Sequence, residues 1–387
     1  MMSKKSPELR FKGFTDEWEQ RKLSNESTIT AGGDIDKSKL KEVGEYPIFA
    51  NALTNDGTVG YYDSYYRVEA PAVTVTGRGD VGHAKARKVN FTPVVRLLAV
   101  KSNHDVDFLE NAINNHKVLV ESTGVPQLTA PQLGNYKIFF PTGEEQQKIG
   151  SFFKQLDDII ALYQRKLDLL KEQKKGFLQK MFPKNGAKVP ELRFKGFTDD
   201  WEERKLGESS DVRDGTHASP KYVSQGHPMV TSKNLTHFGL DMTDVSFLTD
   251  KDFNEINKRS KVSIGDILFG MIGTIGNPVI VDRDDFAIKN VALIKEKTSN
   301  PITNKWLLQY LKSPSFNRFI QKENAGGTQK FISLGLIRDM KLRVPEFDEQ
   351  QKIGAFFKQL DDTIALHQRK LDLLKEQKKG FLQMMFV

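Results

Sequence analysis

A glycine-rich segment at residues 77–82 comes nearest to a cofactor-binding motif. Its letters, GRGDVG, match the G-x-G-x-x-G pattern of dinucleotide-binding loops and follow a predicted strand. That chemistry requires a long helix directly after the loop and an acidic residue at the end of the next strand. Residues 83–88 are too few for such a helix, and the next predicted strand, 94–100, contains no acidic residue. We therefore expect a tight turn between two strands and no dinucleotide.

Two pairs of neighbouring aspartates are the other candidates for catalysis, because paired carboxylates can act as general acid and base. Asp157-Asp158 and Asp361-Asp362 both fall within predicted long helices, so we expect them on a solvated helix face. The sequence has no cysteine, no P-loop, no HExxH motif and no N/D-P-P-Y/F tetrapeptide. Its seven histidines form no cluster with metal-ligand spacing. We predict no catalytic residue, no metal site and no cofactor in this chain.

Basic and amide side chains form local sets that could contact a polyanion. The net charge of +8 at pH 7 suits such a partner without requiring one. On nucleic acid, lysine and arginine would hold phosphates, and arginine, asparagine or glutamine would reach base edges; a solvated surface is the alternative. The candidates are Arg67, Arg78, His83, Lys85, Arg87 and Lys88 in the first half, and Arg213, Thr216, His217, Ser219, Lys221, Lys233, Asn234, Arg259, Lys289, Asn290, Thr328 and Lys330 in the second.

These side chains lie between two blocks that the sequence repeats almost unchanged. Residues 7–23 match residues 190–206 at 15 of 17 positions, at an offset of 183. Residues 145–182 match residues 349–386 at 34 of 38 positions, at an offset of 204. The second half therefore holds 21 more residues between its blocks, and there the halves are not recognisably alike apart from faint echoes, such as residues 75–82 in 269–276. Each half has a constant opening block, a divergent body and a constant closing block.

The closing blocks have the alternating spacing of four and three between apolar residues that indicates a coiled coil. No proline interrupts them, and a helix of 38 residues spans about 57 Å at roughly 1.5 Å per residue. An apolar seam of that length needs a partner. We predict that the two helices pack on each other, antiparallel if a pseudo-twofold axis relates the halves; simple dimerisation is the alternative. The seam would contain Ile149, Phe153, Leu156, Ile160, Tyr163, Leu167, Leu170, Ile353, Phe357, Leu360, Ile364, His367, Leu371 and Leu374.

Lys174 and Lys378 continue the spacing of the seam. They could be polar seam residues that set the register of the two helices, or their ammonium groups could extend to solvent at the edge of the packed region. The tryptophans Trp18 and Trp201 recur unchanged in the opening blocks. Base stacking is one interpretation of these rings. We favour a structural one, in which each ring pins the opening block to its own body, because recognition residues should differ between the halves.

The divergent bodies have short runs of strand-forming residues separated by turn residues. Strands are predicted at 72–76, 94–100, 137–140, 266–270, 278–281, 290–294 and 341–344, and helices at 105–119 and 302–322. We predict an α+β fold: two mixed α/β domains separated by two long helices packed as an antiparallel coiled coil, with a pseudo-twofold internal repeat. The domains would be 1–143 and 184–347, and the helices 144–183 and 348–387.

Together these features resemble the specificity subunit of type I restriction–modification enzymes. The resemblance rests on the repeated PELRFKGF and EQQKIGxFFKQLDD…LLKEQKKGFLQ segments. It is supported by four loops similar to those of that family's target-recognition domains, at 122–129, 215–222, 265–276 and 326–333. It implies that each domain recognises one half of a bipartite, asymmetric target in double-stranded DNA, and that the helices set the gap and dock two methyltransferase subunits. It further implies that restriction subunits join the complex and that S-adenosylmethionine, ATP and Mg are used by those partners.

Two other classes of function stay open from the sequence: a coiled-coil scaffold whose two domains bind protein, and a self-contained enzyme. Residues 1–10 are polar, and no run approaches the roughly 18 apolar residues that a membrane span needs. We therefore expect a cytoplasmic protein with no membrane partner. We also expect poor solubility without the methyltransferase, because the outer helix faces carry Leu162, Leu169 and Leu366.

Overall fold

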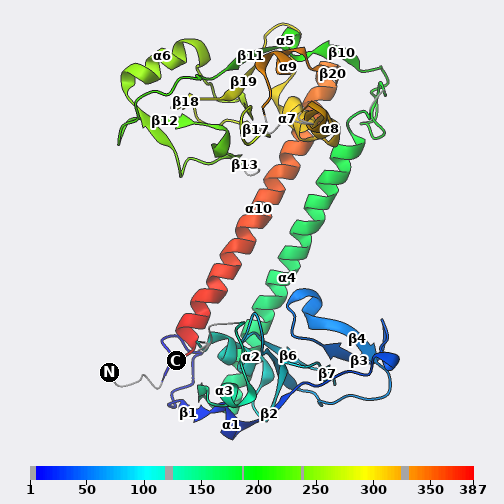
Figure 1. The fold of residues 1–387 in the computed structure, drawn as a ribbon, viewed down its shortest axis with the longest axis vertical. Coiled ribbons are helices and arrows are strands. Elements are labelled where there is room, and N and C mark those ends of the chain that lie inside the picture. The colour runs from blue at the N-terminus through cyan, green and yellow to red at the C-terminus, as the bar shows by residue number, and fades with distance from the viewer. Residues whose placement is uncertain (1–5, 118–124, 185–186, 237–238, 324–330) are drawn as a thin grey trace. The chain divides into compact units, whose positions relative to one another are not determined.

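The computed structural model describes residues 6–117, 125–184, 187–236, 239–323 and 331–387 (Figure 1). The chain divides into two compact units. The first unit is formed by residues 1–165 and 368–387, and the second by residues 166–367. Each contains one globular part and portions of both long helices, α4 (Gly143–Lys180) and α10 (Phe347–Met385). Within the described ranges, no helix is both long enough and apolar enough to cross a membrane.

Three sheets form the globular part of the first unit. The largest is antiparallel, with the order β2 (Ser27–Ala31), β8 (Leu97–Ser102), β5 (Ala72–Thr76) and β6 (Ala84–Arg87). The second has the order β4 (Thr58–Tyr62), β3 (Tyr46–Phe49) and β7 (Thr92–Pro93), in which β3 and β7 are parallel. The third pairs β1 (Glu19–Lys22) with β9 (Lys137–Phe140). The helices are α1 (Leu23–Glu26), η1 (Lys37–Lys39), η2 (Thr54–Gly57), α2 (Val106–Asn115) and α3 (Ala130–Gly134).

The second unit repeats these sheets. Its large sheet has the order β11 (Ser210–Asp214), β19 (Val291–Glu296), β16 (Ile267–Gly270) and β17 (Gly276–Ile280). Its mixed sheet has the order β15 (Ser246–Leu248), β12 (His227–Val230) and β18 (Ala287–Ile288), again with one parallel pair, and β10 (Glu202–Lys205) pairs with β20 (Lys341–Val344). The helices are α5 (Leu206–Ser209), η3 (Ser232–Asn234), α6 (Asp250–Ser260), α7 (Asn304–Lys312), α8 (Pro314–Glu323) and α9 (Leu334–Asp339).

The two bodies therefore share one topology that their sequences do not reveal. The second unit adds a hairpin, β13 (Leu235–Thr236) with β14 (Gly239–Leu240), and helix α6, all between β12 and β16. Its α8 follows directly after α7. The surplus residues of the second half are thus placed around a common core. The predicted α+β class with its internal repeat is confirmed.

Most predicted strands agree with the structure, and the differences have local causes. The strand expected at 94–100 begins at Leu97, because Arg96 has a left-handed φ of 76° that a strand cannot contain. The single helix expected at 302–322 is wrong, because it is divided into α7 and α8. Ser313 is extended (φ −73°, ψ 154°), since proline at position 314 disfavours helical backbone at the residue before it.

The long helices run antiparallel within each unit. In the first unit Lys378 of α10 donates to Asp157 of α4 at 2.6 Å. Lys375, which precedes Lys378 in α10, contacts Gln164, which follows Asp157 in α4, at 3.4 Å. In the second unit Lys174 of α4 pairs with Asp361 of α10 at 2.5 Å. The expectation of solvated carboxylates is therefore wrong for Asp157 and Asp361, which form part-buried ion pairs between the helices.

An aromatic residue just beyond the end of each long helix completes a core. Phe386 lies in the core of the first unit, with its ring centre 6.3 Å from that of Trp18 and 5.8 Å from that of Phe153. Phe182 lies in the core of the second unit, 6.4 Å from Trp201 and 6.1 Å from the ring of α10 that corresponds to Phe153. Both tryptophans are almost fully buried, at 2% and 1% exposed, which confirms their structural role.

We predict that Phe386→Ala destabilises the first unit by about 3–5 kcal/mol, because it leaves a cavity among large rings. Hydrogen exchange should show lost protection in β5 and β8 and little change in β16 and β19. Phe182→Ala is the matched control and should give the opposite pattern. Equal loss of protection in both units after Phe386→Ala would contradict this assignment.

Candidate functional site

A polar surface in the second unit forms where the end of β11 meets the turn between β18 and β19. The amide of Gly215 donates to the carbonyl of Val291 at 2.9 Å, and the amide of Thr216 donates to the carbonyl of Ile288 at 3.0 Å. A Cβ at position 215 would lie 2.3 Å from the Ile288 oxygen, so only glycine permits this approach. In the turn, Asn290 has a left-handed φ of 56°.

Asp214 organises the side chains on this surface. Its carboxylate is 9% exposed and accepts from the guanidinium of Arg259 and, at 2.9 Å, from Nε2 of His217. Nδ1 of His217 lies 2.9 Å from Oδ1 of Asn290. Nζ of Lys289 donates to Oγ of Ser219 at 3.0 Å. Segments that are far apart in the sequence are therefore joined through one nearly buried acid.

Arg213 extends this surface. It pairs with Asp211 at 2.7 Å and donates to the backbone oxygen of Arg259 at 3.2 Å. The hydrogen bond to Asp211 raises the pKa of Arg213, so the guanidinium stays protonated. The structure thus brings seven predicted candidates together, on a surface with three fixed cations and two aspartates: Arg213, Thr216, His217, Ser219, Arg259, Lys289 and Asn290.

The remaining candidates of the second half are not part of this cluster. Asn234 is buried and donates to the carbonyls of Asp241 and Asp244 at 3.1 and 2.9 Å, so its side chain is used inside the fold. Lys233 pairs with Asp244 at 2.8 Å. Lys221 is exposed. Thr328 and Lys330 lie outside the described residues.

The first unit has the same loop and turn with different side chains. The amide of Gly32 donates to the carbonyl of Leu97 at 2.8 Å, and a Cβ there would lie 2.1 Å from the Val94 oxygen. Arg96 corresponds to Asn290 in the pairing of the large sheets and has the same left-handed backbone. Its exposed guanidinium was not among the predicted candidates. Its left-handed backbone, which the sequence does not reveal, identifies it in the structure.

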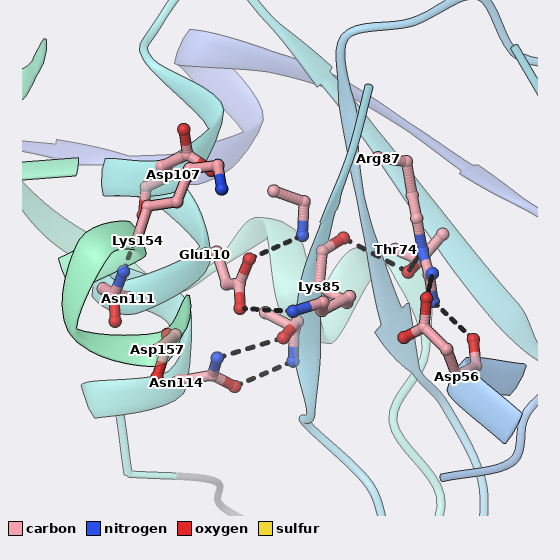
Figure 2. Close-up of polar contacts among 12 residues, drawn as sticks. Asp56, Thr74, Lys85, Arg87, Asp107, Glu110, Asn111, Asn114, Lys154 and Asp157 are labelled. Carbon is pink, nitrogen blue, oxygen red and sulfur yellow. Dashed lines mark hydrogen bonds and ion pairs between the residues drawn. The ribbon is translucent and has the colours of Figure 1, made fainter. Parts of the chain in front are cut away.

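The predicted basic set of the first unit lies mostly around β6 (Figure 2). Arg87 is buried, pairs with Asp56 at 2.5 Å, donates to Oγ1 of Thr74 at 3.0 Å and lies 3.7 Å above the ring of Phe49. Burial lowers the pKa of Arg87, and the charge of Asp56 opposes this. Arg87 is therefore a structural cation in this conformation.

The other basic candidates of the first unit are exposed. Lys85 lies 3.7 Å from Glu110, and Lys88 pairs with Asp107 at 2.5 Å. Arg67 donates to the backbone oxygen of Asp34 at 2.5 Å. Within the described ranges, the side chains of Arg78 and His83 have no polar partner.

The glycine-rich segment 77–82 is a turn that leads from β5 into β6, as expected. Gly79 and Gly82 have φ values of 76° and 86°, and the amide of Gly82 donates to the carbonyl of Thr76 at 2.8 Å. Among the described residues, no cluster of three or more histidines and carboxylates could hold a metal ion.

The predicted seam residues differ in burial along the helices. In α10 the half-buried members lie in the middle of the predicted seam, between buried residues on either side, whereas in α4 the buried Leu167 lies between the half-buried Tyr163 and Leu170. Those buried are Ile149, Phe153, Leu156, Leu167, Ile353, Phe357, Leu371 and Leu374, and those half-buried are Ile160, Tyr163, Leu170, Leu360, Ile364 and His367. On the outer faces Leu162, Leu169 and Leu366 are 56%, 59% and 63% exposed.

The model of the type I restriction modification DNA specificity domain matches residues 15–172 and again residues 198–376. The chain belongs to this family. Both matches span a globular body and most of the long helix that follows it, so the duplicated topology is a duplicated family domain.

Similar proteins and a similar solved structure agree with this family assignment. The MjaVIII specificity subunit of Methanocaldococcus jannaschii is 24% identical over 280 residues, which cover 70% of this chain and 65% of that protein. The putative specificity subunit S.MpnORF507P of Mycoplasma pneumoniae is 28% identical over 164 residues, covering 40% and 45%. The matched regions thus span less than two thirds of both relatives. The solved structure of a type I S subunit from M. genitalium has the same fold, with a TM-score of 0.71, 18% identity and 99% coverage of each chain.

We predict that Asp214→Ala lowers the free energy of unfolding by about 1–2 kcal/mol, because it removes the nearly buried acceptor shared by Arg259 and His217. Asp211→Ala is the matched control, since this aspartate lies on the same strand but is 37% exposed, and it should change stability by about 0–1 kcal/mol. Urea unfolding measures both. Equal effects would show that Asp214 does not organise the surface.

Proposed function

We propose that this chain is the non-catalytic specificity subunit of a type I restriction–modification complex. Domains 1–143 and 184–347 would each recognise one half of a bipartite, asymmetric target in double-stranded DNA. Helices 144–183 and 348–387 would set the gap between the half-sites and dock two methyltransferase subunits. S-adenosylmethionine, ATP and Mg would be bound by methyltransferase and restriction subunits, and the assembly would act in the cytoplasm.

The observation that carries this proposal is a fixed loop geometry with different side chains. Gly32 and Gly215 make the same close approach to the neighbouring strand turn, so the backbones correspond. The residue before the glycine is Ala31 in one unit and Asp214 in the other, and the left-handed turn residue is arginine in one and asparagine in the other. Two similar modules with different polar surfaces are suited to reading two different short sequences.

The outer faces of the helices support the proposed partners. Leu162 and Leu169 recur in the second copy as Leu366 and Leu373, and all four are between 46% and 63% exposed. The two rows have nearly identical surroundings because the closing blocks are nearly identical. A repeated apolar row fits two copies of one partner, as two methyltransferase subunits would be.

A long-read methylation map of cells tests the proposal. Cells that express this chain together with its methyltransferase should gain a methyladenine motif of two short blocks separated by a fixed gap. Cells with the methyltransferase alone should lack that motif. No new motif despite a purified complex of the two proteins would contradict a specificity function.

We predict that Arg96→Ala and Asn290→Ala relax different halves of the target. Each residue occupies the same turn position in its own unit, so each variant should reduce discrimination in one half-site by about 1–3 kcal/mol per lost base contact. Binding of the complex to duplexes with single-base changes in either half-site measures this. Relaxation of the same half-site by both variants would contradict the assignment of one unit to each half.

The salt dependence of binding distinguishes the proposed function from that of a protein-binding scaffold. Contacts to phosphates weaken steeply as salt rises from about 50 to 200 mM, because condensed counterions are released on binding. We predict that the complex loses affinity for its motif over this range with a linear log–log slope. A partner interaction that does not respond to salt, with no DNA binding, would favour the scaffold.

A further inference from the structure

A cleft beside β5 and β6 in the first unit has no assigned role. Its volume is about 390 Å³, and its lining includes Thr74, His83, Lys85, Arg87 and Lys378. Figure 2 shows Thr74 and Arg87 on neighbouring strands beside Asp56, and Lys85 directed toward Glu110. All of these residues belong to the first unit.

The second unit fills the corresponding sheet face with apolar side chains. In the register of the large sheets, Thr74 pairs with Ala99 and Lys85, whereas Leu268 pairs with Leu293 and Val279. The three residues of the second unit belong to one buried apolar cluster. Leu240, from the hairpin that the second unit adds, and Met242 pack against this cluster.

In the first unit the same three positions hold a hydroxyl, a methyl and an ammonium group. Thr74 is buried and accepts from Arg87, while Lys85 is 50% exposed. Smaller and polar side chains at positions that this fold can fill with leucine and valine leave a cavity and weaken the core. Polar side chains at these positions are explained if the cavity that they line holds a ligand.

The backbone groups at the edge of β6 are already hydrogen-bonded to side chains, so the cleft is not a site where a strand of another chain could pair with β6. Asn114 of α2 accepts from the amide of Ala84 at 2.8 Å and donates to its carbonyl at 3.0 Å. Glu110 accepts from the amide of Ala86 at 2.8 Å. These side chains satisfy the backbone groups that an exposed edge strand would offer to another chain (Figure 2).

The charges in the cleft favour an anion. Arg87 is neutralised by Asp56 at 2.5 Å, and Lys378 by Asp157 at 2.6 Å. Lys85 is held only loosely, with its ammonium group 3.7 Å from Glu110. His83 lies two residues before Lys85 on the chain and lines the same cleft without a polar partner among the described residues.

We propose that this cleft binds a phosphate group of the DNA backbone through Lys85 and His83, with Arg87 as a positioning residue that holds the cleft wall. The inference rests on the proposed function and deepens it. It assigns a backbone contact that is specific to the first unit, because the second unit has an apolar cluster at that place.

Lys85→Gln tests this in the full chain complexed with its methyltransferase, with affinity for the methylated motif measured as a function of salt. Each phosphate contact contributes about 0.9 to the slope of log affinity against log salt, so the slope should become shallower by about that amount. Lys41→Gln is the matched control, since Lys41 is also exposed and ion-paired but does not line the cleft, and it should leave the slope unchanged. His83→Gln should lower affinity without changing which motif is methylated.

An unchanged slope for Lys85→Gln, with the motif still methylated, would overturn the cleft assignment and leave the proposed function intact. Absence of a motif with the wild-type chain would instead refute the proposed function. Calorimetric titration with inorganic pyrophosphate, without DNA, distinguishes the source of the phosphate. Micromolar binding that Lys85→Gln removes would overturn the assignment to DNA in favour of a soluble phosphate ligand.

Discussion

The fold depends on where the long helices end. Phe386, which follows α10, is part of the first core, and Phe182, which follows α4, is part of the second. Each core therefore needs a ring from a helix that begins in the other unit. Since a large aromatic side chain contributes several kcal/mol to a core, neither body is complete with its own continuous segment of sequence alone.

The polar contacts of the framework are duplicated in the same way. Arg10 forms a bidentate pair with Glu145 at 2.6 and 2.7 Å, and Arg193 forms the same pair with Glu349 at 2.7 and 2.8 Å. Both glutamates are fully buried, where an unpaired carboxylate would be strongly destabilising. These pairs fix each opening block to the start of its own long helix. The near-identity of the repeated blocks thus reflects contacts that tolerate little change.

The sequence was sufficient to predict this framework but not the common topology of the bodies. Helix spacing and repeated blocks are local signals, and they predicted the antiparallel helices and the buried tryptophans. The bodies share mainly the apolar character of core positions: Val100 corresponds to Ile294 and Val73 to Ile267, and outside the faint echo of 75–82 in 269–276 a comparison of letters does not align them. Pro314 shows a further limit, because the helical apolar pattern continues across Ser313, whose backbone is extended before the proline.

The candidate surfaces were predicted in part for a related reason. A search for cations found Arg259 and Lys289 but not Asp214, whose importance lies in a tertiary ion pair with Arg259 and a contact with His217. The same limit concealed the equivalence of Arg96 and Asn290, which depends on backbone conformation. At these turns the glycine contact and the left-handed φ fix the path of the chain, whereas the side chains are free to vary. A module built in this way can change the side chains at these turns without changing the path of its backbone.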